Sequence, residues 1–142
     1  MSDIKFMLQA LEISKKALPK CIPNPPVGCV LVKDGRVISE GFTQSIGGNH
    51  AELEAIKNYS GLLDNVTAYV TLEPCSFEGR TPSCAKMIAD TNINKVIVAT
   101  LDPDRRNNGK GIEILRDNGL QVEVGIGAKE VNEFINLYLG HS

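Results

Sequence analysis

The sequence has no excess of positive charge. It contains 15 lysines and arginines against 17 aspartates and glutamates, which gives a formal net charge of −2 at pH 7. A protein that binds nucleic acid through the phosphate backbone carries clustered positive charge. The balance therefore argues against a nucleic-acid partner. It leaves room for a small anionic substrate held by one or two local cations.

Long apolar runs are missing as well. No run reaches the roughly 18 residues that a membrane-spanning helix needs. The N-terminal stretch MSDIKFMLQALEISKKAL mixes charged and apolar side chains, unlike the unbroken apolar core of a secretory signal peptide. We therefore expect no membrane contact and a cytoplasmic location, where the four cysteines are expected to be thiols or metal ligands rather than disulfides.

Repeats, low-complexity tracts and linkers are also missing, so the length of 142 residues predicts a single domain over residues 1–142. Hydrophobic periodicity and turn residues predict helix 4–18, strands 27–33 and 36–42, helix 50–59, strand 66–72, helix 82–91, strand 95–100, helix 110–118, strand 120–126 and helix 128–139. The first two strands form a hairpin across Asp34-Gly35. Helices between the later strands predict parallel pairing. The expected fold class is α/β: a three-layer α/β/α sandwich on a five-stranded mixed sheet.

Two cysteines, Cys75 and Cys84, have eight residues between them in LEPCSFEGRTPSC. They form a disulfide, fill the apolar core, or bind a metal. A disulfide conflicts with the expected compartment, and burial alone leaves the adjacent proline and the upstream His50-Ala51-Glu52 unexplained. One histidine and two cysteines suit zinc, and three protein ligands leave the fourth position open, as in catalytic zinc sites. A closed structural site needs a fourth ligand, and His141 is the only other histidine.

Glu52 is predicted to carry protons rather than to bind the metal. In zinc deaminases an H-x-E sequence precedes a later P-C, and the glutamate acts as general acid and base beside an activated water. Both parts are present here, but the cysteine spacing is C-x8-C instead of C-x2-C. The spacing alone is weak evidence, whereas the combination with H-A-E and Pro-Cys is strong evidence for a zinc deaminase.

Five short stretches together resemble the pyrimidine deaminases of riboflavin biosynthesis, over about residues 3 to 138. They are NPPVG (24–28), HAE (50–52), LEPC (72–75), GRTPSC (79–84), and D-P followed by GKGI (102–103 and 109–112). The long insert G-[RK]-T-P-x-C is similar to this family, whereas cytidine, dCMP and tRNA-adenosine deaminases have C-x-x-C. The resemblance implies the cytidine-deaminase-like fold, zinc bound by His50, Cys75 and Cys84, Glu52 as the catalytic residue, and a homo-oligomer.

The resemblance also implies the reaction. The substrate would be 2,5-diamino-6-ribosylamino-4(3H)-pyrimidinone 5′-phosphate, whose amine at C2 is replaced by oxygen with release of ammonia. Asn24 would contact the ring or the ribose of the substrate. The alternative is that Asn24 is simply a turn residue before Pro25. Arg80, fixed in its loop with Thr81, would bind the 5′-phosphate. The alternative is that Arg80 is an exposed charge on a solvated loop. Asp102 is either a loop element or a substrate contact.

Three departures from the family stand out. Thr43 replaces a histidine that helps to hold the substrate, so it is counted here among the substrate-binding residues. The run DRRNN at 104–108 replaces an N-P-x-V-type run and adds Arg105 and Arg106, which lie either near a phosphate or on the surface. Many family members continue into a reductase domain, and for this chain we expect the deaminase domain alone. The alternatives are a sister deaminase acting on another aminated heterocycle and a non-catalytic zinc-binding module.

Overall fold

A computed structural model describes residues 3–45, 48–76 and 83–139. Within these ranges five strands form one sheet in the order β2-β1-β3-β4-β5. The strands are β1 (Gly28–Lys33), β2 (Arg36–Phe42), β3 (Val66–Leu72), β4 (Lys95–Thr100) and β5 (Gln121–Val124). The helices are α1 (Asp3–Ser14), α2 (Ala51–Lys57), α3 (Cys84–Ala89), α4 (Lys110–Asp117) and α5 (Ala128–Ile135).

The sheet is mixed, as predicted. Strand β1 pairs antiparallel with both β2 and β3, whereas β3, β4 and β5 are parallel to one another. The β1–β2 hairpin turns through Asp34 and Gly35, whose φ angles of 52° and 75° are both positive, as a type I′ turn requires. The parallel strands β3 and β4 therefore end at the same edge of the sheet, where the segments after them lie side by side.

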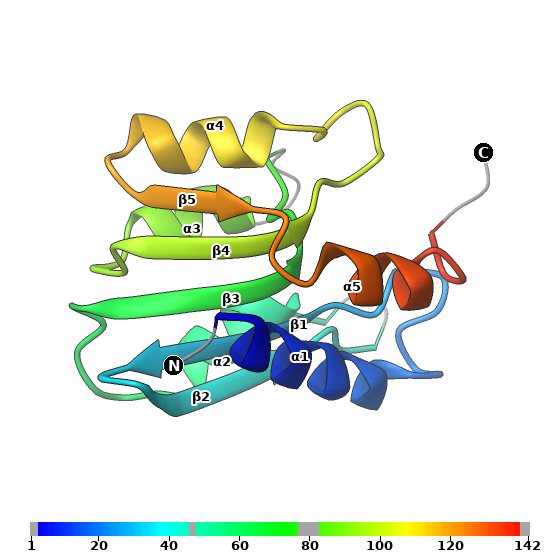
Figure 1. Cartoon of the computed structure of the whole chain (residues 1–142), viewed down its shortest axis with the longest axis horizontal. Helices are drawn as coiled ribbons and strands as arrows, with labels where there is room; N and C mark the ends of the chain where they lie inside the picture. Colours follow the sequence, from blue (N-terminus) through cyan, green and yellow to red (C-terminus); the bar gives the residue numbers. More distant parts are fainter. Residues whose placement is uncertain (1–2, 46–47, 77–82, 140–142) are drawn as a thin grey trace.

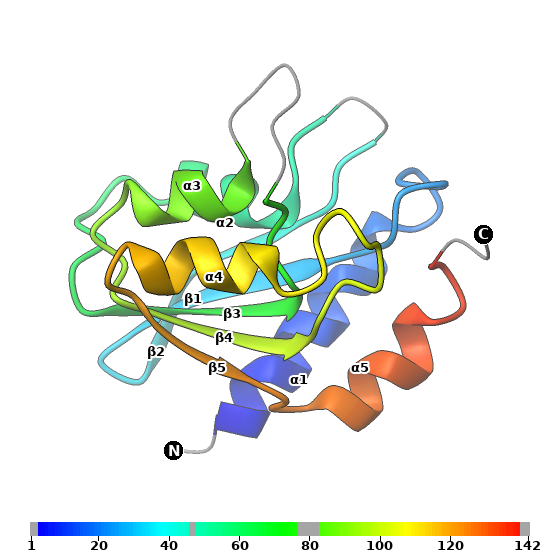
Figure 2. The same cartoon turned by 90° about the horizontal axis from the view of Figure 1, so that it is seen from above.

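Helices cover both faces of the sheet. Helices α1 and α5 lie on one face and α2, α3 and α4 on the other (Figures 1 and 2). Alternate residues of β4 point to opposite faces: Val96 and Val98 belong to the core under α2, α3 and α4, while Ile97 and Ala99 belong to the core under α1 and α5. Burial on both faces explains why this strand is continuously apolar, and the three-layer α/β/α prediction is confirmed.

Several element ends differ from the prediction, for local reasons. The predicted helix 4–18 ends at Ser14 and is followed by a 3-10 turn, because Leu18 precedes Pro19 and is extended. The last strand ends at Val124 because Gly125 turns the chain with a φ of 113°. All helices in the described ranges are short, and none of them is long and apolar enough to cross a membrane.

Two glycines let helices approach the edge of the sheet where the parallel strands end. A Cβ atom at Gly41 of β2 would overlap the carbonyl oxygen of Ala51 at the start of α2. A Cβ at Gly111, in the first turn of α4, would overlap the carbonyl oxygen of Pro74 after β3. Because glycine has no Cβ, the starts of α2 and α4 can lie directly against the strand ends.

Candidate metal centre and active site

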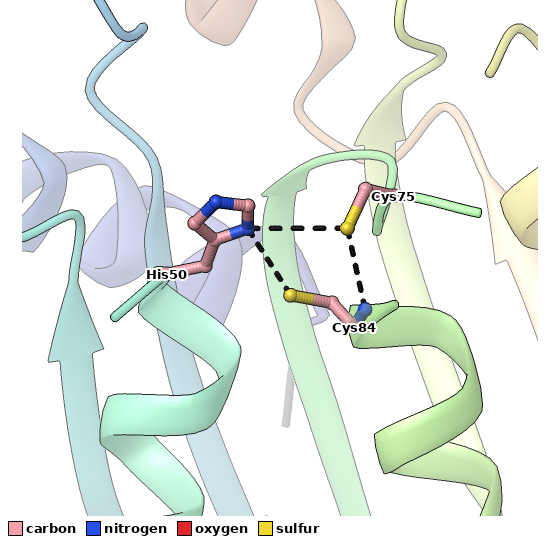
Figure 3. Close-up of side chains that lie close together, drawn as sticks. All are labelled: His50, Cys75 and Cys84. Carbon is pink, nitrogen blue, oxygen red and sulfur yellow. Dashed lines mark hydrogen bonds between the residues drawn. The ribbon is translucent and has the colours of Figure 1, made fainter. Parts of the chain in front are cut away.

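Three side chains with metal-binding atoms converge from three different elements. His50 immediately precedes α2, Cys75 follows β3, and Cys84 is the first residue of α3 (Figure 3). His50 Nδ1 lies 3.2 Å from Cys84 Sγ and 3.9 Å from Cys75 Sγ. The ligand atoms of all three lie within 4.8 Å of one another. The structure thus brings together the predicted ligands, which are 34 residues apart in sequence at most.

The start of α3 is anchored on the Cys75 segment. The Cys84 amide donates to Cys75 Sγ at 3.2 Å, and the Ala85 amide donates to the Cys75 carbonyl at 3.0 Å. Ser83 caps the helix by accepting a hydrogen bond from the Lys86 amide, as its side chain favours. These backbone contacts hold the first turn of α3, which carries Cys84, next to Cys75.

The electrostatics of the cluster favour a cation. Hydrogen bonds from Cys84 and His50 lower the pKa of the Cys75 thiol. The same shared hydrogen bond and burial raise the pKa of Cys84. A divalent ion held between the two sulfurs would stabilise both as thiolates.

The donor set fits zinc. Zinc binds imidazole nitrogen and thiolate sulfur at about 2.0–2.3 Å, which places neighbouring tetrahedral ligands about 3.5–4 Å apart. The two measured nitrogen–sulfur separations, 3.2 and 3.9 Å, lie close to this range. None of the four cysteines forms a disulfide, so the disulfide alternative is wrong. Cys29 lies in the core, and Cys21 is also buried.

Glu52 lies in the first turn of α2, next to the cluster but outside it. Its side chain is only 5% exposed, and this burial raises the pKa of the carboxyl to about 7. A carboxyl group with a pKa near neutrality both accepts and donates protons at physiological pH. In the described part of the chain, the group of metal-binding atoms consists of His50, Cys75 and Cys84 without Glu52, which agrees with its predicted separate role.

One cavity of about 950 Å³ opens onto both the cluster and Glu52. Its size is within the range of small-molecule sites. Asn24, Thr43 and Asp102 lie on its wall, together with His50, Glu52 and Cys75. Arg80 and Thr81, the other two predicted substrate contacts, lie outside the described residues.

Thr43 uses its hydroxyl group on the backbone of the NPPVG loop. The hydroxyl accepts a hydrogen bond from the Val27 amide at 2.9 Å and donates one to the Pro25 carbonyl at 3.2 Å. The Thr43 amide in turn donates to the Val27 carbonyl at 3.1 Å. Thr43 therefore fixes the loop that follows Asn24, while a direct contact with substrate stays a prediction.

The variant Thr43→Val keeps the shape of this side chain and removes its hydroxyl. It leaves the Val27 amide without its acceptor, so we expect a loss of about 1–3 kcal/mol in the free energy of unfolding. The KM should rise because Asn24 is held less firmly. Thr43→Ser retains the hydroxyl and should stay close to the wild type. Denaturant titration and steady-state kinetics measure both effects, and a valine variant equal to the wild type in both would refute this role.

Glu73 is a site residue that sequence reasoning missed. Its side chain is 3% exposed and accepts three backbone hydrogen bonds. Oε1 accepts from the amides of Asp102 and Gly109 at 3.1 and 3.0 Å, and Oε2 accepts from Ile112 at 3.2 Å. Glu73 therefore ties both ends of the 101–109 loop to the strand end that carries Cys75. A charged residue directly after an apolar strand signals that a buried partner exists, but not which one.

We expect Glu73→Ala to lower the free energy of unfolding by roughly 2–4 kcal/mol, because one buried and two partly buried amides lose their acceptor. Glu123→Ala is the matched control, since Glu123 lies on edge strand β5 and forms a 3.8 Å ion pair with Lys95. An exposed pair of this kind contributes about 0–1 kcal/mol. Equal stabilities of the two variants in denaturant titration would contradict the assigned role.

Asp102 is a structural element of the same loop. Its Oδ1 accepts from the Asp104 amide at 3.0 Å and its Oδ2 from Asn107 Nδ2 at 3.3 Å. Asp102 also lines the cavity. The loop role is therefore shown, and the alternative of a substrate contact stays a prediction.

Comparison with known proteins places these features in a family. Residues 1–100 match the family model described as the cytidine and deoxycytidylate deaminase zinc-binding region. The chain is 39% identical over 134 residues to the diaminohydroxyphosphoribosylamino-pyrimidine deaminase of Buchnera aphidicola subsp. Acyrthosiphon pisum, covering 94% of this chain and 91% of that protein. It is 45% identical over 134 residues to riboflavin biosynthesis protein RibD of Chlamydia pneumoniae, covering 94% of this chain.

A solved structure agrees closely. The diaminohydroxyphosphoribosylaminopyrimidine deaminase/5-amino-6-(5-phosphoribosylamino)uracil reductase of Thermotoga maritima superposes with a TM-score of 0.90 at 41% identity, covering 95% of this chain and 39% of that one. The likeness confirms the cytidine-deaminase-like fold. The chain spans only 36% of the Chlamydia protein, and thus about a third of the length of such relatives.

Proposed function

Because this chain belongs to the zinc-binding cytidine and deoxycytidylate deaminase family, we propose that it catalyses the deamination step of riboflavin biosynthesis. The substrate is 2,5-diamino-6-ribosylamino-4(3H)-pyrimidinone 5′-phosphate, which exchanges its C2 amine for oxygen and releases ammonia. One observation carries the proposal: a single cavity reaches both the His50–Cys75–Cys84 cluster and Glu52. Support for the substrate comes from the Buchnera relative of nearly equal length, which is named for this deamination.

Each residue of the site has a distinct role in this reaction. His50 Nδ1 and the sulfurs of Cys75 and Cys84 hold the zinc, which when bound supplies the Lewis acidity that makes water nucleophilic at neutral pH. The Glu52 carboxylate accepts the proton that water loses as its oxygen bonds to C2. Glu52 passes this proton to the ring nitrogen. It then accepts the second proton of the former water from the new C2 hydroxyl group and donates it to the amine, which leaves as ammonia as the C2–oxygen double bond forms.

The cavity wall positions the substrate. Asn24 lies on this wall, where its amide can donate to and accept from the ring or the ribose, and Thr43 fixes the loop that follows it. Arg80 and Thr81 are proposed to meet the phosphorylated end. A positioned substrate with its C2 atom near both the metal and Glu52 needs no further group to carry the protons.

Ammonia release from the purified, zinc-loaded chain tests the proposal. We expect steady release from the diaminopyrimidinone ribose phosphate and much slower release from cytidine and dCMP. Release mainly from another aminated heterocycle would favour the sister-deaminase alternative, which Thr43 and the run at 104–108 motivate. A chain that binds zinc but releases ammonia from none of these substrates would favour the non-catalytic module.

We further propose that residues 1–142 act as one deaminase domain without reductase activity and assemble as a homo-oligomer. All described strands belong to one sheet with its covering helices, which supports a single domain. The deaminated product incubated with NADPH should stay unreduced, and light scattering should give a mass above that of one chain. Reduction of the product, or a monomer at assay concentration, would contradict the respective part.

A further inference from the structure

We propose that Arg105 binds the phosphate of the substrate and makes the site specific for phosphorylated pyrimidines. The inference rests on the proposed function, because it names a group that recognises one part of that substrate. Arg105 lies on the wall of the same cavity as the metal cluster and Glu52. It belongs to the 101–109 loop, which follows β4 at the edge of the sheet where β3 also ends (Figure 2).

The loop that carries Arg105 is held from inside the molecule. Glu73 binds the amides of Asp102 and Gly109, near its two ends. Asn107 is fully buried and donates from Nδ2 to the Pro74 carbonyl at 3.2 Å. The backbone between these anchors is turned by hydrogen bonds from the Asn107 and Asn108 amides to the Asp104 carbonyl, at 2.9 and 2.8 Å. The position of Arg105 on the wall is therefore set before any ligand binds.

Nearby negative charges are already paired within the loop. The Asp104 carboxylate accepts hydrogen bonds from Nη2 of Arg106 at 2.7 Å and from its Nε at 3.1 Å. Asp102 accepts from the Asp104 amide and from Asn107. These partners reduce the repulsion that the two aspartates would exert on an anionic ligand in the cavity.

Arg105 has no partner among the residues that the structure describes. In the described ranges, its guanidinium makes no hydrogen bond or ion pair with the rest of the chain, and the residue is exposed. A second arginine on the described cavity wall, Arg106, pairs with Asp104. A guanidinium presents a planar set of donors that matches two phosphate oxygens. In a chain of net charge −2, such a local cation offsets the cost of bringing a phosphate dianion beside acidic residues.

Steady-state kinetics with the phosphorylated substrate and with its dephosphorylated riboside distinguish phosphate binding by Arg105 from a general effect of the substitution on the site. We expect Arg105→Ala to raise the KM for the phosphorylated substrate about 10- to 100-fold, the effect of losing a charged hydrogen-bond donor, with kcat nearly unchanged. For the dephosphorylated riboside, the variant and the wild type should have the same KM. Arg105→Lys should retain part of the effect. Arg36→Ala is the control, because Arg36 is an exposed arginine at the hairpin turn, at the far end of β2 from Thr43.

A binding measurement makes the test independent of turnover. Calorimetric titration of the zinc-loaded chain with ribose 5-phosphate should show binding to the wild type and to Arg36→Ala, and binding about 10- to 100-fold weaker to Arg105→Ala. If the wild type releases ammonia but Arg105→Ala keeps its KM for the phosphorylated substrate, the inference about Arg105 fails and the proposed function stands. If the wild type releases no ammonia, the proposed function fails, and equal binding of ribose 5-phosphate by all three proteins would overturn the Arg105 site as well.

Discussion

Replacing Glu52 with glutamine is expected to lower kcat about 100- to 10,000-fold, the range that general acid–base groups contribute. Glutamine has nearly the same shape as glutamate but neither accepts a proton from water nor returns one to the leaving amine. The ligand atoms of His50, Cys75 and Cys84 are untouched, so the zinc content should stay at the wild-type level. Ammonia release and metal analysis on the same protein preparation measure the two quantities together.

Glu54→Gln provides the control on the same helix. Glu54 accepts a hydrogen bond from Asn49 Nδ2, which a glutamine oxygen also accepts, and it does not line the cavity. This variant should keep most of the activity. If Glu52→Gln retained the kcat of the wild type, the proton-carrying role of Glu52 would be wrong even though its burial and position are as described.

Cys84→Ala is expected to remove both the metal and the activity. Only His50 and Cys75 would then remain as ligands, and the loss of one thiolate also removes charge that balances the cation. We expect the zinc content after dialysis to fall from about one ion per chain to a small fraction of it, with ammonia release reduced to background. The measurement is metal analysis by mass spectrometry beside the activity assay.

Cys21→Ala is the matched control, because Cys21 is also buried but is not among the clustered metal-binding atoms. It should bind zinc and release ammonia like the wild type, with at most a small loss of stability from the deleted sulfur. Full zinc binding by Cys84→Ala would show that another ligand set holds the ion.

The sequence predicts a feature well where a local pattern of residues is enough to determine it. The predicted strands 66–72 and 95–100 have the bounds that the structure shows, because the first is rich in β-branched residues and the second is a short, continuously apolar run. The metal-binding residues were identified from the chemistry of a histidine and two cysteines in a characteristic order. These inferences needed no knowledge of which elements pack together.

The sequence pattern does not predict features that depend on how distant elements pack together. Nothing local indicates that β1 lies between β2 and β3, or that the Glu73 carboxylate meets amides 29 to 39 residues further along the chain. The family pattern predicts a substrate contact for the hydroxyl of Thr43, whereas its hydrogen bonds to the 25–27 backbone depend on how that segment packs against the residue after β2. The availability of Arg105 likewise follows from the pairing of Arg106 with Asp104.

The most direct test of the central claim follows the oxygen atom. The zinc-loaded chain is incubated with the diaminopyrimidinone ribose phosphate in water enriched in heavy oxygen, and the product is identified by mass spectrometry while ammonia is counted. Hydrolytic deamination predicts one heavy oxygen bonded to C2 and one ammonia for each product molecule. Ammonia without labelled product, or a substrate that is recovered unchanged from a chain carrying its zinc, would contradict it.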